Sequence, residues 1–183
     1  MYTGKNIRLR AIEKDDIPLF LEWLNDAEVI RGLTILYPMG LEDENSWFDK
    51  MRQLPLEEHP LMIETREGKG WKAIGNCSFM NIDWRNANAE LGIMIGEKQY
   101  WDKGMGTETI QLMLKVAFEA LNLHRVWLRV FEDNQRALRC YEKVGFVNEG
   151  RLRDAEFRYG KYMGVLLLGM LRPDWKDDYH PGV

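Results

Sequence analysis

Two glycines, Gly104 and Gly106, stand between an apolar segment and a strongly amphipathic one. Glycine leaves the neighbouring backbone N–H groups uncovered. The helix predicted to follow adds unpaired N–H groups and the positive end of its dipole, and together these favour an anion such as a pyrophosphate. Lys103 could add a positive charge and Thr107 a hydroxyl donor. A tight strand-to-helix turn without a ligand is the alternative, and two glycines alone favour that alternative.

Two common phosphate loops do not fit this turn. The chain contains no G-x-x-x-x-G-K-[ST] pattern, which excludes a Walker loop. The dinucleotide fingerprint needs a third glycine or alanine where Thr109 stands, and it usually opens an early strand–helix–strand unit rather than lying mid-chain. Both interpretations therefore fail.

A tyrosine lies in the second stretch that could carry chemistry, residues 134–146. At helical spacing, Ala137, Cys140, Tyr141 and Val144 share one face, so Tyr141 is predicted to point toward the sheet. A phenol in that place could deliver a proton, whereas a core tyrosine with a satisfied hydroxyl is the alternative. The apolar face of Cys140 indicates packing rather than nucleophilic chemistry.

Carboxylates supply the candidate base and the candidate amine site. Glu90 begins an apolar strand and could accept a proton through a water, while a solvated carboxylate at a strand edge is the alternative. Residues 28–48 combine acidic and aromatic groups, which suit a cationic amine. An acidic helix start that only complements the dipole is the favoured alternative. The stretch offers Glu28, Arg31, Tyr37, Glu42, Asp43, Glu44 and Trp47.

The hydrophobic pattern predicts the elements that position these residues. Helical spacing predicts helices over 15–24, 41–54, 134–143 and from Gly106 to Leu121. This order predicts a mixed α/β (α+β) fold, with a twisted sheet of about seven strands and helices on both faces. A single domain over 1–183, with its core at about 7–171, is expected. Alternating or continuous apolar runs predict strands over 6–11, 61–65, 71–81, 89–95, 126–131, 146–155 and 162–171.

Composition excludes several classes of protein. The 183 residues carry 25 Lys and Arg against 29 Asp and Glu, a formal net charge of −4, which disfavours nonspecific nucleic-acid binding. No apolar run approaches the roughly 18 residues of a membrane helix. Two cysteines and three histidines at unrelated positions predict neither a disulfide framework nor a metal site. The first residues show no hydrophobic leader, so a cytoplasmic location is expected.

Taken together and in this order, the glycine turn and residues 134–146 resemble the GNAT superfamily of N-acetyltransferases. The resemblance is greatest to its RimJ/RimL-like branch of ribosomal-protein and polyamine acetyltransferases. It covers nearly the whole chain, from Ile7–Arg10 through Glu90–Ile93 to the terminal hairpin. It implies acetyl-CoA as the donor, with no metal. The donor-binding residues that it implies are Ile93, Met94, Ile95, Lys103, Gly104, Met105, Gly106, Thr107, Asn134 and Lys143.

The resemblance also implies where the donor lies. Its pyrophosphate rests on backbone amides around Lys103–Thr107, and its pantetheine arm runs between the strands that end at Ile95 and Phe131. Asn134 hydrogen-bonds that arm, and Tyr141 faces the thioester sulfur. The chain departs from the family pattern [Q/R]-x-x-G-x-[G/A] at Trp101, which occupies the first position and puts a polar phosphate contact from that side chain in doubt.

The function implied is direct transfer of an acetyl group to a primary amine, and a protein N-terminus, a small polyamine, an amino sugar and an aminoglycoside all remain open as acceptors. A lysine-like amine with a pKa of about 10.4 is almost wholly protonated at pH 7, so such an acceptor needs a base. Glu90 is the candidate base, Tyr141 the candidate acid, and the N–H of Met94 or Ile95 the candidate oxyanion donor. A noncatalytic acyl-CoA-binding sensor is the alternative. Such proteins are often homodimers.

Overall fold

A computed structural model describes residues 2–176, which form one eight-stranded mixed sheet covered by helices. The strands follow the order β1-β2-β3-β4-β5-β6-β8-β7, and only β5 and β6 pair in parallel. The predicted fold class is confirmed, with one strand more than expected. The strands are β1 (Tyr2–Thr3), β2 (Ile7–Ala11), β3 (Leu61–Glu67), β4 (Gly70–Asp83), β5 (Asn88–Ile95), β6 (Arg125–Phe131), β7 (Val147–Arg158) and β8 (Lys161–Leu171).

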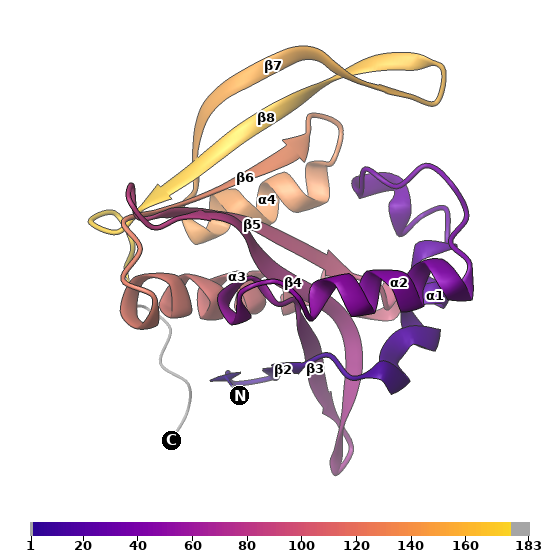
Figure 1. Ribbon diagram of the computed structural model, residues 1–183. Helices are drawn as coiled ribbons and strands as arrows, with labels where there is room; N and C mark the ends of the chain where they lie inside the picture. Colours follow the sequence, from indigo (N-terminus) through magenta and orange to yellow (C-terminus); the bar gives the residue numbers. More distant parts are fainter. Residues whose placement is uncertain (1, 177–183) are drawn as a thin grey trace.

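Four α-helices cover the two faces of this sheet (Figure 1). Those on one face are α1 (Ile17–Leu24) and α2 (Leu41–Met51), and those on the other are α3 (Met105–Lys115) and α4 (Gln135–Val144). A π-helical turn, Val116–Ala120, extends α3. In the described part of the chain, no helix has the length and apolar character needed to cross a membrane.

Alternation along the strands divides the core into two apolar clusters. Met62 and Met94 point toward α1 and α2, whereas the adjacent Ile63 and Ile93 point toward α3 and α4. Successive side chains of a strand face opposite sides, so each central strand serves both clusters. The sheet is therefore buried on both faces, as its apolar strands predict.

A gap opens in the sheet between β5 and β6. Their pairing includes only three positions, Asn88 with Arg125, Ala89 with Val126 and Glu90 with Trp127. Both strands then continue, β5 to Ile95 and β6 to Phe131, without pairing to each other. The side of β5 that faces the gap therefore carries backbone groups with no strand partner.

The β7–β8 hairpin arches over the rest of the sheet (Figure 1). At the end of β7, the buried Arg158 donates hydrogen bonds to the carbonyl oxygens of Arg31 and Ile30, at 2.9 and 3.1 Å. Its guanidinium also stacks over the Phe131 ring, 4.7 Å from the centroid. The hairpin is thus fastened both to the segment that follows α1 and to the end of β6.

Candidate active site

The predicted anion cradle lies at the start of α3. Gly104 has a φ of 82°, a left-handed conformation that favours glycine, and it directly precedes the helix. In the described part of the chain, a Cβ added to Gly104 would meet no atom within 4 Å. One added to Gly106 would meet only the Cys140 sulfur, at 3.6 Å. Space is therefore open beside this helix end, whose first N–H groups have no partner within the helix, and such an end suits an anion.

The side chains of the cradle lie in two different environments. Lys103 is exposed, with its ammonium 5.9 Å from the Tyr100 ring centroid. Thr107 is partly buried, and its hydroxyl lies 3.2 Å from the Cys140 sulfur on α4. Burial raises the pKa of the Cys140 thiol, which agrees with its predicted packing role. Met105 faces the other way, where its sulfur accepts a hydrogen bond from Thr65.

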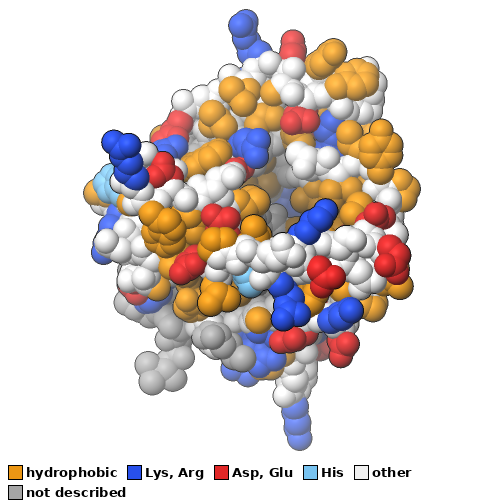
Figure 2. Space-filling view, viewed as in Figure 1, with side chains coloured by type: hydrophobic (Ala, Val, Ile, Leu, Met, Phe, Trp, Pro, Cys, Tyr) orange, Lys and Arg blue, Asp and Glu red, His pale blue; other side chains and the backbone are white. Residues whose placement is uncertain are grey.

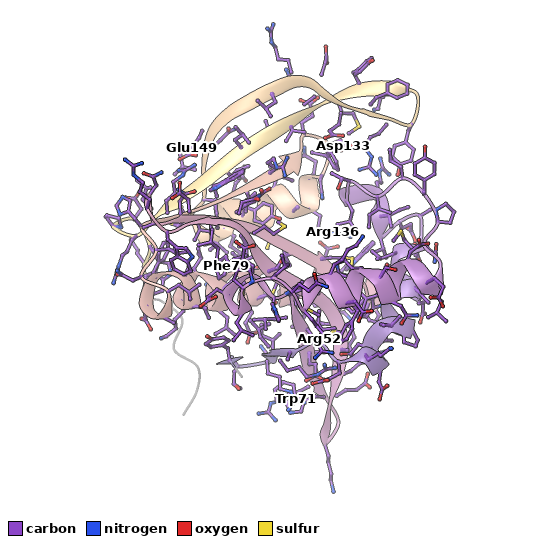
Figure 3. All side chains as sticks on the ribbon, viewed as in Figure 1. Arg52, Trp71, Phe79, Asp133, Arg136 and Glu149 are labelled. Carbon is purple, nitrogen blue, oxygen red and sulfur yellow. The ribbon has the colours of Figure 1, made fainter. Side chains whose placement is uncertain are left out.

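Arg136 is a charged neighbour of the cradle that sequence reasoning missed. It lies in the first turn of α4 and is labelled in Figure 3. Its guanidinium stacks over the Trp101 ring, 3.5 Å from the centroid. The Trp101 indole N–H donates to the Ile95 carbonyl at 2.7 Å. Trp101 therefore contacts the end of β5 through its N–H, while a cation from α4 covers its ring. The sequence shows only that Arg136 precedes Ala137 in the predicted helix, and it gives no sign of the contact with Trp101.

The gap contains the backbone donors that a thioester could use. The Gly96 N–H donates to the Ile74 carbonyl on β4. Backbone groups of a strand alternate in direction, and Met94 pairs with Asn76, so the Met94 N–H also faces β4. Those of Ile93 and Ile95 face the gap instead. Of the two predicted oxyanion donors, only the Ile95 N–H faces the gap. The prediction for the Met94 N–H is wrong, because that group faces β4.

Tyr141 lies on α4 within the apolar cluster that includes Ile93 and Val130. It is 7% exposed, and its ring packs edge-on against Phe146 at 5.9 Å. No described residue forms a hydrogen bond with its hydroxyl, and the hydroxyl oxygen is accessible to solvent although the ring is buried, which disagrees with a core tyrosine whose hydroxyl is satisfied within the protein. Burial raises the pKa of this phenol, so it is protonated at neutral pH.

The other two predicted donor-binding residues lie on the same helix. Asn134 caps α4, with its side-chain oxygen accepting a hydrogen bond from the Ala137 N–H at 3.2 Å. This bond uses the amide oxygen and leaves the amide NH2 group available to a ligand. Lys143 is exposed in the last turn of α4.

Glu90 is buried, so the solvated strand-edge interpretation is wrong. It is 4% exposed and lies at the last paired position of β5 and β6. One carboxylate oxygen accepts from the Arg129 guanidinium at 2.8 Å, and the other accepts from the Asn81 amide at 3.1 Å. A carboxylate oxygen has more than one acceptor site, so a water can still bind to Glu90.

A cavity of about 430 Å³ lies between α1, α2 and the sheet. Ile93 and Met94 of β5 line it, so it adjoins the gap. Figure 2 shows this face of the molecule hollowed near its centre, above α2. Of the acidic and aromatic side chains at 28–48, Glu44 and Trp47 line the cavity.

Two acidic residues in the first turn of α2 lie in different environments. One fits a helix start that complements the dipole, and the other fits a site for a cationic amine. Asp43 is exposed and accepts a hydrogen bond from the Gly40 N–H at 2.9 Å, as a helix-start residue should. Glu44 is instead 2% exposed and lies on the buried stripe with Phe48 and Met51. Burial raises its pKa, and the Asp43 charge adds to the effect. Its place in an apolar stripe was the signal that could have singled it out.

Comparison with known proteins identifies the fold and the chemistry. The sequence model of the acetyltransferase (GNAT) domain matches residues 6–147. The chain belongs to the GNAT acetyltransferase family. The GNAT chain is 26% identical over 175 residues to the uncharacterized N-acetyltransferase p20 of Bacillus licheniformis, which covers 96% of this chain and 97% of that protein. It is 29% identical over 172 residues to the spermidine N(1)-acetyltransferase of Vibrio cholerae, covering 92% and 95% respectively.

A solved structure shares the fold of this GNAT protein. The crystal structure of spermidine N-acetyltransferase from Vibrio cholerae in complex with CoA and spermine superposes with a TM-score of 0.84, at 24% identity, covering 93% of this chain and 98% of that one. The GNAT protein is an N-acetyltransferase that uses acetyl-CoA and acts on amines. The noncatalytic sensor interpretation is therefore not retained.

The geometry of the described residues fits the donor. Open N–H groups at the start of α3 suit a pyrophosphate, and the unpaired side of β5 suits an extended arm with amide groups. No group of three His, Cys, Asp or Glu side chains within residues 2–176 is arranged to hold a metal ion.

Proposed function

We propose that this GNAT enzyme transfers the acetyl group directly from acetyl-CoA to a primary amine, in the gap between β5 and β6. The observation that carries the proposal is the Tyr141 hydroxyl on the helix that follows β6: its ring is buried, but the hydroxyl is accessible to solvent and has no partner among the described residues. Lys103–Thr107 bind the pyrophosphate, and the Ile93–Ile95 edge binds the arm. Asn134 and Lys143 add side-chain contacts from α4.

In the proposed step, the amine nitrogen forms a bond to the acetyl carbon while the carbon–sulfur bond breaks. The Ile95 N–H donates to the carbonyl oxygen as negative charge develops there. The proton lost by the amine passes through a water to Glu90, and solvent later removes it.

Tyr141 supplies the proton that the departing thiolate needs. Because burial raises the pKa of Tyr141, complete transfer to sulfur is more uphill than for a free phenol. The phenol therefore donates a hydrogen bond first, and its proton follows as the sulfur becomes a thiolate. Solvent then restores the phenol.

Release of free thiol from acetyl-CoA across a panel of amines tests the proposal. We expect Tyr141→Phe to lower kcat by about a hundredfold, since general acids contribute on that order, with CoA affinity by calorimetry unchanged. Tyr162→Phe removes a similar hydroxyl from an exposed site on β8 and should change neither value. Full kcat in Tyr141→Phe would remove the acid role, and failure of the folded protein to bind CoA would remove the whole scheme.

We also propose that the enzyme belongs to the RimJ/RimL-like branch and acts in the cytoplasm as a homodimer. Exposed apolar side chains on the β7–β8 hairpin support a protein contact there. Light scattering should give twice the chain mass of 21.6 kDa, and a monomer at micromolar concentration would contradict the dimer. The side chains are Val147, Leu152, Phe157, Tyr159 and Tyr162.

A further inference from the structure

Among residues 2–176, one charged side chain lines the cavity beside the gap. Glu44 is 2% exposed and lines the cavity, and no described residue donates a hydrogen bond to its carboxylate or forms an ion pair with it. The described residues that line the cavity include no Lys, Arg or His. A buried carboxylate without a partner is costly, so this one is suited to a cation that arrives from outside the protein.

The remaining wall of the cavity is largely apolar. Phe20 and Trp47 pack against each other at 5.2 Å between centroids, and Ile35 and Met39 line the same space. On the sheet side, Ser78 of β4 adds a hydroxyl. A cavity of about 430 Å³ lies within the usual range for small-ligand sites, about 300–1,000 Å³.

We propose that the acceptor is a primary amine with one positive charge on an apolar body, and that Glu44 binds its ammonium group. This inference rests on the proposed function, because it assigns the acceptor of that same reaction. The apolar body lies against Phe20, Trp47 and Met39. A polyamine would bring two or more further ammonium groups into a cavity whose described lining residues offer them no second carboxylate. Removal of the amine proton remains with Glu90.

Two kinds of acceptor have one ammonium group on an apolar body: a small arylalkylamine and the N-terminus of a peptide with an apolar first residue. A panel of acceptors distinguishes them. The panel contains 2-phenylethylamine, a tetrapeptide amide that begins with leucine, spermidine, and ethanolamine, a monoamine without an apolar body. With acetyl-CoA saturating, we expect kcat/KM for one of the first two to exceed that for spermidine and ethanolamine by at least about tenfold. Higher kcat/KM for spermidine would overturn the inference.

Substitution of Glu44 tests the ammonium site. Glu44→Gln should raise KM for the preferred monoamine at least about tenfold, leave kcat within about threefold, and leave CoA affinity unchanged. Glu44→Asp keeps the charge but withdraws it by one methylene. Its KM should therefore lie between that of the wild-type protein and that of Glu44→Gln. The matched control is Glu42→Gln, the same change at an exposed carboxylate in the same helical turn, with no effect on KM expected.

The outcomes separate the inference from the function on which it rests. No thiol release with any amine, by protein that binds CoA, would remove the proposed function itself. Turnover of amines with an unchanged KM in Glu44→Gln would overturn the inference alone. A loss confined to kcat would also overturn it, because it would assign Glu44 to the chemical step instead of to binding.

Discussion

Trp101 and Arg136 determine which polar and charged groups lie beside the proposed donor cradle. Trp101 directs its N–H to the Ile95 carbonyl, so it has no further polar group to offer a phosphate. The cation nearest to its ring is Arg136, which approaches from α4. We therefore expect Arg136 to take over the phosphate contact that the Gln or Arg of the family pattern would make from the turn.

Arg136→Ala should weaken CoA binding about five- to tenfold, because a charge-assisted contact to a phosphate is lost. Arg139→Ala removes the same side chain from an exposed position of the same helix and should change affinity less than twofold. Calorimetric titration with CoA measures both. Equal affinities in the two variants would show that Arg136 has no part in donor binding.

Glu44 makes the stability of the protein depend on pH. Its pKa is raised in the folded state, so between the unfolded value, near 4.5, and the raised value the folded state holds more protons than the unfolded chain. The free energy of unfolding therefore falls as the pH rises through this interval. Glu44→Gln removes that loss and should raise Tm at pH 7.5 by about 2–4 °C, which corresponds to about 1 kcal/mol.

Thermal melts followed by circular dichroism at pH 4 and pH 7.5 measure this effect. The two proteins should melt at similar temperatures at pH 4, where Glu44 is largely protonated in both states. Glu42→Gln at its exposed site should show no gain. A Glu44→Gln variant that melts at or below the wild-type temperature at pH 7.5 would contradict the prediction.

At the scale of elements, the start of α3 depends on one backbone conformation. Gly104 has a φ of 82°, where an alanine side chain is strained although space is open around it. Gly104→Ala should cost about 1 kcal/mol of stability and weaken CoA binding, because the helix start must shift. Gly68→Ala in the β3–β4 turn, at a φ of 58° and also in open space, should show a similar loss of stability with normal CoA affinity. Denaturant melts and calorimetry measure the two effects, and normal CoA binding by Gly104→Ala would exclude the cradle.

Elements with a long apolar pattern were predictable, and the short or irregular ones were not. The apolar stripe from Ile110 to Phe118 predicted the helix that the structure shows as α3 and its π-helical turn. The apolar run at 126–131 predicted the central strand β6. The two-residue β1 is too short to show any period. The direction of the Met94 N–H depends on which neighbour β5 pairs with at that point, and a single strand does not carry that information.

At the scale of the whole molecule, the site joins segments that lie far apart in the chain. Arg158 binds carbonyl groups at Ile30 and Arg31, more than a hundred residues earlier, and no local pattern predicts such a pairing. The glycine turn, Tyr141 and Glu90 could be proposed from the sequence because residue type and the spacing of a helix or a strand mark them as candidates. Arg136 was not predicted because its contact with Trp101 depends on how α4 packs, which the sequence of the helix alone does not show.

The open side of β5 has a consequence for the protein between turnovers. Unsatisfied strand edges are templates for self-association, and natural proteins usually protect them with charges, proline or a covering loop. Leu91–Ile95 contains none of these charges or prolines, and it is apolar apart from one glycine. If the donor binds along β5 as proposed, it also covers this unpaired edge, so we expect protein stored without it to be the form more exposed to aggregation.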